Sequence, residues 1–219
     1  MLESCHSGLA ALSRQRPLRV DILLFPEVEI LDFAGPYEVF SVASRVTRRD
    51  RLLPHAAFEV RTVAASASPL TARHGLRLIP DASFADELPC DVLIVPGGVV
   101  TQPLQDRATL NWIGATAVRA QLIASVCTGA FVLAEAGLLE GQMVTTHWED
   151  IADLQRQYPH LKVVEGVPYV DLGTRITSAG ISAGIGMSLH LVARILGDEV
   201  ARATARQMQY DWVDHPGLP

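Results

Sequence analysis

Short apolar runs alternate along this chain with stretches whose apolar residues recur at helical spacing. Residues 19–25, 91–95 and 121–126 are mostly apolar, which is typical of strands that are buried on both faces of a sheet. Within residues 39–46, apolar side chains return every three or four positions, as on the buried face of a helix. Strands that alternate with helices in this way predict an α/β fold, with a parallel sheet covered by helices.

The same pattern predicts the remaining elements. Further strands or hairpins are expected over residues 58–64, 69–79, 144–146 and 169–177. Further helices are expected over residues 108–119, from 128 to 137, over 149–158, around 185–196 and over 199–212. Gly35-Pro36 is expected to begin the first helix, because proline is tolerated in the first turn of a helix.

The organisation that we predict is a flexible leader over residues 1–17, which are polar and irregular, and a single domain over 18–219. A chain of this length can bury roughly 70% of its unfolded surface, so it needs no metal or disulfide to fold. Its three cysteines, Cys5, Cys90 and Cys127, are an odd number without a close pair. This argues against a disulfide framework and favours a reducing, cytoplasmic location.

The charge of the chain excludes some classes of protein. A formal net charge of −6 argues against a general nucleic-acid binder, which would need a basic excess to neutralise phosphates. The basic stretch from Arg45 to Arg51 is expected to be a solvated helix end, where cations suit the helix dipole. No apolar run approaches the roughly 18 residues of a membrane span, so no membrane segment is expected.

The first candidate for chemistry is Cys127, where a predicted strand meets a predicted helix. Small residues, Ser125 and Gly129, lie two positions before and two positions after it. A sharp nucleophile turn requires this, because the backbones approach closely there. Free N–H groups and the dipole at a helix start favour a thiolate, so we expect a lowered thiol pKa. The alternative is that Cys127 is only a small buried apolar residue.

Asp32 is the second candidate, in the loop after the first predicted strand. Loops at the carboxyl ends of parallel strands line one crevice, so Asp32, the turn at Pro96-Gly97-Gly98 and Cys127 should face one another. If burial raises its pKa, this carboxyl could share a proton with the thiol and donate it to a substrate. Alternatively, Asp32 is only an acidic residue that is favoured near a helix start.

Two weaker signals lie at other strand ends. The N–H groups of Gly97 and Gly98 are expected to be free to stabilise developing negative charge, unless this pair is only a turn. His147 follows a short strand and could act as a base, although a lone histidine is more often structural. The chain has no H-E-x-x-H, C-x-x-C, Walker A or G-x-G-x-x-G motif, so neither a metal site nor a nucleotide site is expected.

With these residues in place, the chain resembles the ThiJ/PfpI superfamily, which implies a flavodoxin-like, class-I glutamine-amidotransferase-like fold with a nucleophile elbow at Cys127. The resemblance covers nearly the whole chain after residue 18. It is carried by Phe25-Pro26, Leu31-Asp32, Gly35-Pro36, Val95-Pro96-Gly97-Gly98, Val126-Cys127-Thr128-Gly129-Ala130, Thr145-Thr146-His147-Trp148 and Thr177-Ser178-Ala179-Gly180.

Within the superfamily, the pattern is most similar to isocyanide hydratases and to the sensor domains of AraC-type transcription regulators. By this resemblance Cys127 is the nucleophile, Asp32 handles the proton, and Thr128 supplies a hydroxyl or backbone donor beside the thiol. The resemblance also implies a homodimer and no cofactor. Peptidase-like members carry histidine at the position of Thr128, so protease activity is not expected. The regulators continue into a helix-turn-helix region, whereas this chain ends seven residues after Trp212, so we expect no nucleic-acid binding by the chain itself.

Three functions follow as hypotheses. The first is a cysteine-dependent hydratase that adds water to an isocyanide carbon and gives an N-substituted formamide. The second is a module that binds a metabolite in the same crevice, or senses oxidation through the Cys127 thiol. The third is a glyoxalase or deglycase activity on α-oxoaldehydes, which uses a similar thiol.

Overall fold

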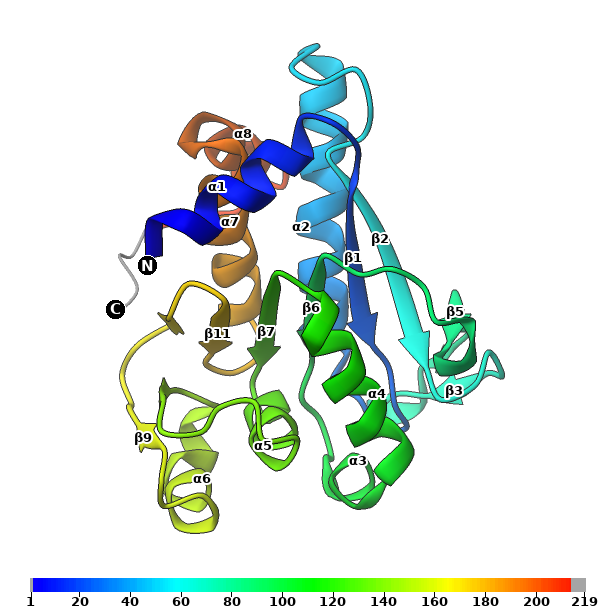
Figure 1. Cartoon of the computed structure of the whole chain (residues 1–219), viewed down its shortest axis with the longest axis vertical. Helices are drawn as coiled ribbons and strands as arrows, with labels where there is room; N and C mark the ends of the chain where they lie inside the picture. The colour runs from blue at the N-terminus through cyan, green and yellow to red at the C-terminus, as the bar shows by residue number, and fades with distance from the viewer. Residues whose placement is uncertain (1, 214–219) are drawn as a thin grey trace.

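A seven-stranded sheet forms the centre of the computed structural model, which describes residues 2–213, with side chains from residue 8 onward (Figure 1). The strands lie in the order β10-β11-β7-β6-β1-β2-β5. Their bounds are β1 Leu18–Leu23, β2 Phe58–Ala64, β5 Ala82–Ser83, β6 Val92–Val95, β7 Leu122–Val126, β10 Tyr169–Asp171 and β11 Arg175–Ser178. Neighbouring strands are parallel except β10 and β11. The predicted α/β fold is confirmed, and the order of its parallel strands is flavodoxin-like.

Helices cover both faces of this sheet (Figure 1). Their bounds are α1 Leu2–Ser13, α2 Ile30–Arg49, α3 Thr101–Gln105, α4 Arg107–Arg119, α5 Gly129–Glu135, α6 Ile151–Gln157, α7 Ala183–Leu196 and α8 Asp198–Gln207. Helices α1, α2, α7 and α8 contact one another in one layer, and α3, α4 and α5 contact one another in the other. Within residues 2–213, no helix is both long and apolar enough to cross a membrane.

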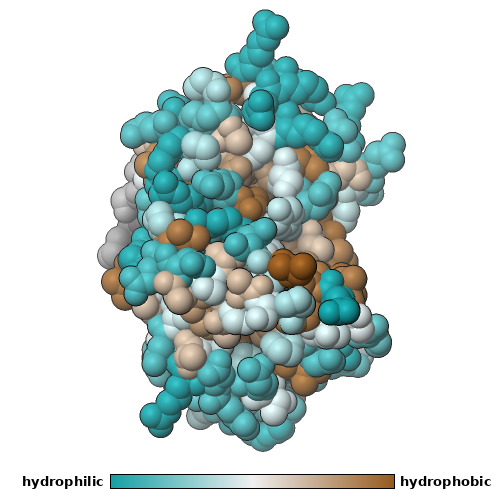
Figure 2. All heavy atoms as spheres, turned by 90° about the vertical axis from the view of Figure 1, so that its right-hand side faces the viewer, coloured by the Kyte–Doolittle hydropathy of each residue, from teal (hydrophilic) through white to brown (hydrophobic). Residues whose placement is uncertain are grey.

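Small strand pairs complete the architecture. The hairpin predicted over residues 69–79 is confirmed, because β3 (Leu70–Thr71) pairs antiparallel with β4 (Arg77–Leu78). The antiparallel pair of β10 and β11 confirms the hairpin predicted over 169–177. A further parallel pair joins β8 (Met143–Val144) and β9 (Lys162–Val163). The face over β3 and β5 is largely hydrophilic, with separate hydrophobic patches (Figure 2).

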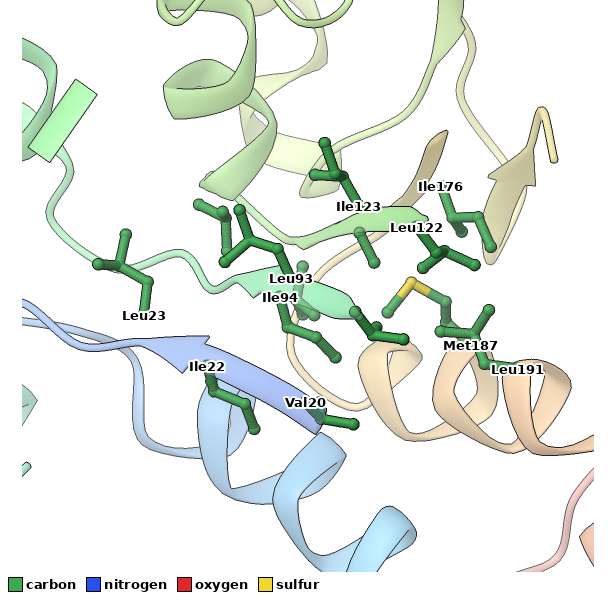
Figure 3. Close-up of a cluster of buried hydrophobic side chains, with 14 of the residues drawn as sticks. Val20, Ile22, Leu23, Leu93, Ile94, Leu122, Ile123, Ile176, Met187 and Leu191 are labelled. Atoms are coloured by element: carbon green, nitrogen blue, oxygen red, sulfur yellow. The ribbon is translucent and has the colours of Figure 1, made fainter. Parts of the chain in front are cut away.

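The core lies on both faces of the central strands, and one part of it lies between these strands and α7. Figure 3 shows side chains from β1, β6, β7, β11 and α7 in one cluster. Its labelled members are buried: Val20, Ile22, Leu23, Leu93, Ile94, Leu122, Ile123, Ile176, Met187 and Leu191. Burying one such side chain stabilises a fold by about 1.5–3 kcal/mol. The strands are therefore held firmly, and the loops at their carboxyl ends rest on a rigid base.

The N-terminal segment differs from the prediction. Residues 2–13 form α1, which contacts α7, and Leu9 is buried. Arg16 then donates two hydrogen bonds, of 2.7 and 2.8 Å, to the carboxylate of Asp91. The expected irregular leader is therefore wrong for residues 2–13. Cys5 belongs to the residues whose side chains the structure does not describe.

Two helix boundaries also differ from those predicted. Helix α2 begins at Ile30, and the Glu29 side chain accepts a hydrogen bond of 3.3 Å from the Ile30 N–H. Gly35-Pro36 therefore lies inside the helix, and Asp32 lies in its first turn rather than in a loop. The last helix, α8, ends at Gln207, before the predicted end at residue 212.

Candidate active site

Cys127 stands on a sharp turn between β7 and α5. Its backbone is left-handed, with φ 56°, a conformation that costs a residue with a side chain about 1–3 kcal/mol. Neighbouring groups hold it there. The Cys127 N–H faces the carbonyls of Ser178 and Ala179 at 3.2 and 3.3 Å, and the Cys127 carbonyl accepts a 2.8 Å bond from the Thr146 hydroxyl. A Cβ at Gly129 would overlap the carbonyl oxygen of Val95, so this turn does require a glycine there.

The Asp32 carboxyl lies beside Cys127 and is fully buried. Its Oδ2 accepts a 3.0 Å hydrogen bond from the Gly97 N–H, while Oδ1 has no hydrogen-bond partner among the described residues. The Cys127 thiol faces this carboxyl, and its interaction acts to lower the pKa of Asp32. Burial raises the pKa of Asp32 to about 7, and the nearby Glu29 carboxylate adds to the rise. Asp32 can therefore hold or release a proton near neutral pH, as a group that passes a proton to a substrate must.

The pKa of the Cys127 thiol is shifted in the direction opposite to the one predicted. Burial raises the pKa of Cys127 to about 12, and the carboxylates of Asp32 and Asp150 add to the rise. Backbone N–H groups of Thr128 and Ile181 act in the other direction. The expected lowering is therefore wrong, because these two donors are outweighed by burial. Around neutral pH the site holds a thiol, and its proton must leave as the sulfur reacts.

The turn at Gly97 and Gly98 joins Asp32 to the elbow. The Gly97 N–H donates to Asp32, and the Gly98 N–H donates a 2.9 Å bond to the Thr128 hydroxyl. That hydroxyl in turn donates a 3.0 Å bond to the Gly98 carbonyl. Both N–H groups are thus engaged, and the prediction that they are free is wrong. Thr128 has two roles here, since its hydroxyl fixes the turn and its N–H faces the sulfur.

His147 packs on a loop of the site and makes no hydrogen bond with Cys127 within the described part of the chain. It precedes a single turn of 3₁₀ helix, Trp148–Asp150, and its Nδ1 lies 3.5 Å from an Asp150 carboxylate oxygen. Its ring packs on Gly180, where a Cβ would overlap the imidazole. Gly180 precedes Ile181, whose N–H faces Cys127. His147 thus supports the loop that carries this donor.

Some groups at the site were not identified from the sequence. Asp150 was missed because it acts on the thiol only through its charge, from a turn that comes 23 positions later in the chain. Ile181 was missed because it acts through its backbone N–H, which leaves no signal in the residue type. Its φ of 49° is also unusual for a β-branched residue. Ile181 is also an exposed apolar residue, as are Leu31 and Trp148, which adjoin Asp32 and His147 in the sequence.

Comparison with known proteins identifies the family of this chain. Residues 18–194 match the DJ-1/PfpI family. The chain is 35% identical over 198 residues to an isonitrile hydratase of Pseudomonas putida, covering 88% of this chain and 78% of that protein. It is 29% identical to the HTH-type transcriptional regulator GbdR of Pseudomonas aeruginosa, covering 94% of this chain and 55% of the regulator. The chain thus spans about half the length of that regulator.

Solved structures agree with the sequence relatives. A ThiJ/PfpI family protein from Pseudomonas syringae superposes with a TM-score of 0.77 at 28% identity, covering 91% of this chain and 77% of that one. An AraC family transcriptional regulator from Pseudomonas putida superposes with a TM-score of 0.72 at 23% identity, covering 88% of this chain and 100% of that one. At that identity the second similarity concerns the fold alone.

Proposed function

Because the chain belongs to the DJ-1/PfpI family, we propose that it is a cysteine-dependent hydratase, which adds water to the terminal carbon of an isocyanide. The observation that carries this proposal is the buried pair of Asp32 and Cys127. A carboxyl whose pKa is about 7 lies beside a thiol whose pKa is about 12, so the carboxylate can take the thiol proton as the sulfur attacks. The similarity to an isonitrile hydratase supports the choice of substrate class.

In the first half of the reaction, the Cys127 sulfur attacks the terminal carbon of the isocyanide. The thiol proton moves to the Asp32 carboxylate, and Asp32 then delivers it to the carbon that has gained the electron pair. An S–C bond and a C–H bond form, and the product is a thioimidate on Cys127. The N–H groups of Thr128 and Ile181 face the sulfur and stabilise its developing negative charge.

In the second half, water adds to the thioimidate carbon. Asp32, again a carboxylate, takes a proton from the water and delivers it to the thioimidate nitrogen, and the remaining hydroxyl proton passes to the sulfur as the C=O bond forms and the S–C bond breaks. An N-substituted formamide leaves, and the thiol is regenerated. These steps use only groups of the chain itself, so the proposal calls for no cofactor. His147 enters it as a support for Gly180 rather than as a base.

The direct test is turnover with purified protein. A panel of isocyanides and α-oxoaldehydes is offered to the wild type and to Cys127→Ala, and the products are identified by mass. We expect formamide from the isocyanides with wild type and none with Cys127→Ala. Formamide production by Cys127→Ala at the wild-type rate would overturn the proposal. Conversion of the α-oxoaldehydes alone would favour the glyoxalase-type alternative.

A binding module is the second candidate, and the similarity to GbdR along most of this chain favours it. The ligand would occupy the crevice at Asp32 and Cys127 without being converted. The buried thiol with its raised pKa argues for binding rather than oxidation sensing, because peroxide reacts with thiolates. Intact-mass analysis after mild peroxide tests this point: oxygen on Cys127 at doses that spare Cys90 would favour sensing.

A homodimer is part of the same proposal. Leu31, Trp148 and Ile181 are exposed apolar residues around the site, and a second copy of the chain could cover them. Light scattering on the purified protein should give twice the mass of the chain. A monomer at micromolar concentration would remove this part of the proposal and leave the chemistry unaffected.

A further inference from the structure

Far from the site, arginine side chains of two helices meet around one hollow. Helix α8 packs against α2, and α8 and the C-terminal part of α2 lie at the end of the molecule away from α5 and α6 (Figure 1). The hollow between them has a volume of about 760 Å³. It is lined by Arg49, Arg202, Ala203, Arg206, Gln207 and Gln209. Three guanidinium groups and two amides therefore face one space, and no lining residue is acidic.

The positive charge of the hollow is only partly compensated. Arg49 binds the Asp50 carboxylate at 2.7 and 3.0 Å and donates a 2.9 Å bond to the Gln207 side chain. Arg202 lies over the Trp212 ring, 5.9 Å from its centroid. Arg206 has no ion pair with any residue that the structure describes. Of the three guanidinium groups, only that of Arg49 is therefore paired with a carboxylate that the structure describes, in a protein whose formal net charge is −6.

Two of these arginines are already oriented. The bidentate contact with Asp50 and the bond to Gln207 hold the Arg49 guanidinium, and the Trp212 ring orients Arg202. Less side-chain entropy is then lost when a ligand binds. A planar guanidinium offers a fork of N–H donors that matches the oxygens of a phosphate group. The fork of Arg49 is already engaged by Asp50, so the forks of Arg202 and Arg206 are the ones that face the hollow without a carboxylate partner among the described residues, and they suit a ligand with more than one such group.

We propose that the hollow between α2 and α8 is a binding site for a small anion that carries several phosphate groups. A hollow of this volume falls in the range of sites for whole small ligands, and is large for a single inorganic ion. Nucleic acid fits less well, because the net negative charge of the protein repels a long polyanion. The site is separate from Cys127, since Asp32 and Arg49 are about 25 Å apart along α2.

The test is calorimetric titration of the full chain with sodium tripolyphosphate at low and physiological salt. We expect saturable binding at one site per chain, weaker at higher salt. The double variant Arg202→Gln, Arg206→Gln should bind at least tenfold more weakly. The matched control is Arg156→Gln, which removes an exposed arginine of α6 that pairs with Asp153, and it should bind like wild type. Unchanged melting temperatures would show that the variants are folded.

Several outcomes would overturn the proposal. The first is the absence of saturable heat with wild type, and the second is equal affinity of the double variant and the Arg156→Gln control. A third arm replaces tripolyphosphate with a short DNA duplex. If the duplex binds more tightly than tripolyphosphate, and the double variant loses that binding, the surface recognises a nucleic-acid backbone instead.

Discussion

Two buried thiols in this protein each lie beside a buried carboxyl, and only one pair is suited to chemistry. At the carboxyl edge of the sheet, Cys127 and Asp32 are 7% and 0% exposed; at the opposite edge, Cys90 and Asp21 are 4% and 2% exposed. Burial raises the pKa of all four groups. Burial therefore does not distinguish the two sites.

The two sites differ in whether a cation is paired with the carboxyl. Arg61 on β2 lies opposite Asp21 in the sheet register and bonds its carboxylate at 2.6 and 2.8 Å. Asp21 is thereby held as an anion, and the Cys90 thiol donates to the Val92 carbonyl at 3.2 Å. Asp32 has no cationic partner among the described residues, and one of its oxygens accepts no hydrogen bond. Arg61 gives the pair of Cys90 and Asp21 a structural role. The pair of Cys127 and Asp32 has no such arginine, so its proton is available for transfer.

Replacing each thiol in turn should give the largest difference between the two sites. We expect Cys127→Ala to abolish isocyanide hydration, because the nucleophile is lost. Cys90→Ala should keep activity within about twofold and cost roughly 1 kcal/mol of stability. Steady-state turnover and chemical denaturation of both variants check this. Comparable losses of activity in both would contradict the comparison.

Neutralising the two carboxyls should have opposite consequences. Asp32→Asn is expected to lower turnover by roughly 10²-fold or more, as for other positioned proton-transfer groups, without loss of stability at pH 7. Asp21→Asn should keep turnover but destabilise the fold by about 3 kcal/mol, since it leaves the Arg61 charge without its partner. The two variants are compared by kcat and by urea denaturation.

The pH dependence of the rate follows from the same pair. Below a pH of about 7, Asp32 is protonated and cannot accept the thiol proton. We therefore expect kcat/KM to fall about tenfold per pH unit below that value and to level off above it. In Asp32→Asn this transition should be absent. A wild-type profile that is flat from pH 5 to 8 would show that Asp32 does not handle the proton.

Stability should change with pH over the same range, by a smaller amount. The pKa of Asp32 is raised in the folded state to about 7, so the folded protein binds this proton more tightly than the unfolded chain. The contribution is fully present below pH 4 and is lost as the pH rises to 7. It amounts to at most about 4 kcal/mol. Unfolding free energies of wild type should fall across this window relative to those of Asp32→Asn.

Much of the fold followed from the sequence, because buried parallel strands have a simple pattern. The runs that became β6 and β7 are apolar at nearly every position, and both strands are buried along their length. Boundaries were less predictable. Helix α2 starts at Ile30 because Glu29 caps it, although glutamate is not among the preferred capping residues. Residues 2–13 looked irregular, yet they form a helix that packs on α7.

The site was predictable at the level of side chains that follow strands, and less so at the level of backbone donors. Asp32 and Cys127 were found because both follow strands of one sheet edge. The donors that face the sulfur are the N–H groups of Thr128 and Ile181 rather than those of Gly97 and Gly98. Hydrogen bonding in three dimensions decides which backbone groups stay available, and residue type does not reveal it.

The most direct test of the central claim is the mass of the protein during a single turnover with an isocyanide. Samples are quenched at intervals, digested, and searched for modified cysteines. The account predicts that the peptide containing Cys127 gains the mass of the isocyanide, and that this adduct decays at the rate at which formamide appears. Formamide that forms without any adduct on Cys127, or with an adduct on Cys90 instead, would contradict it.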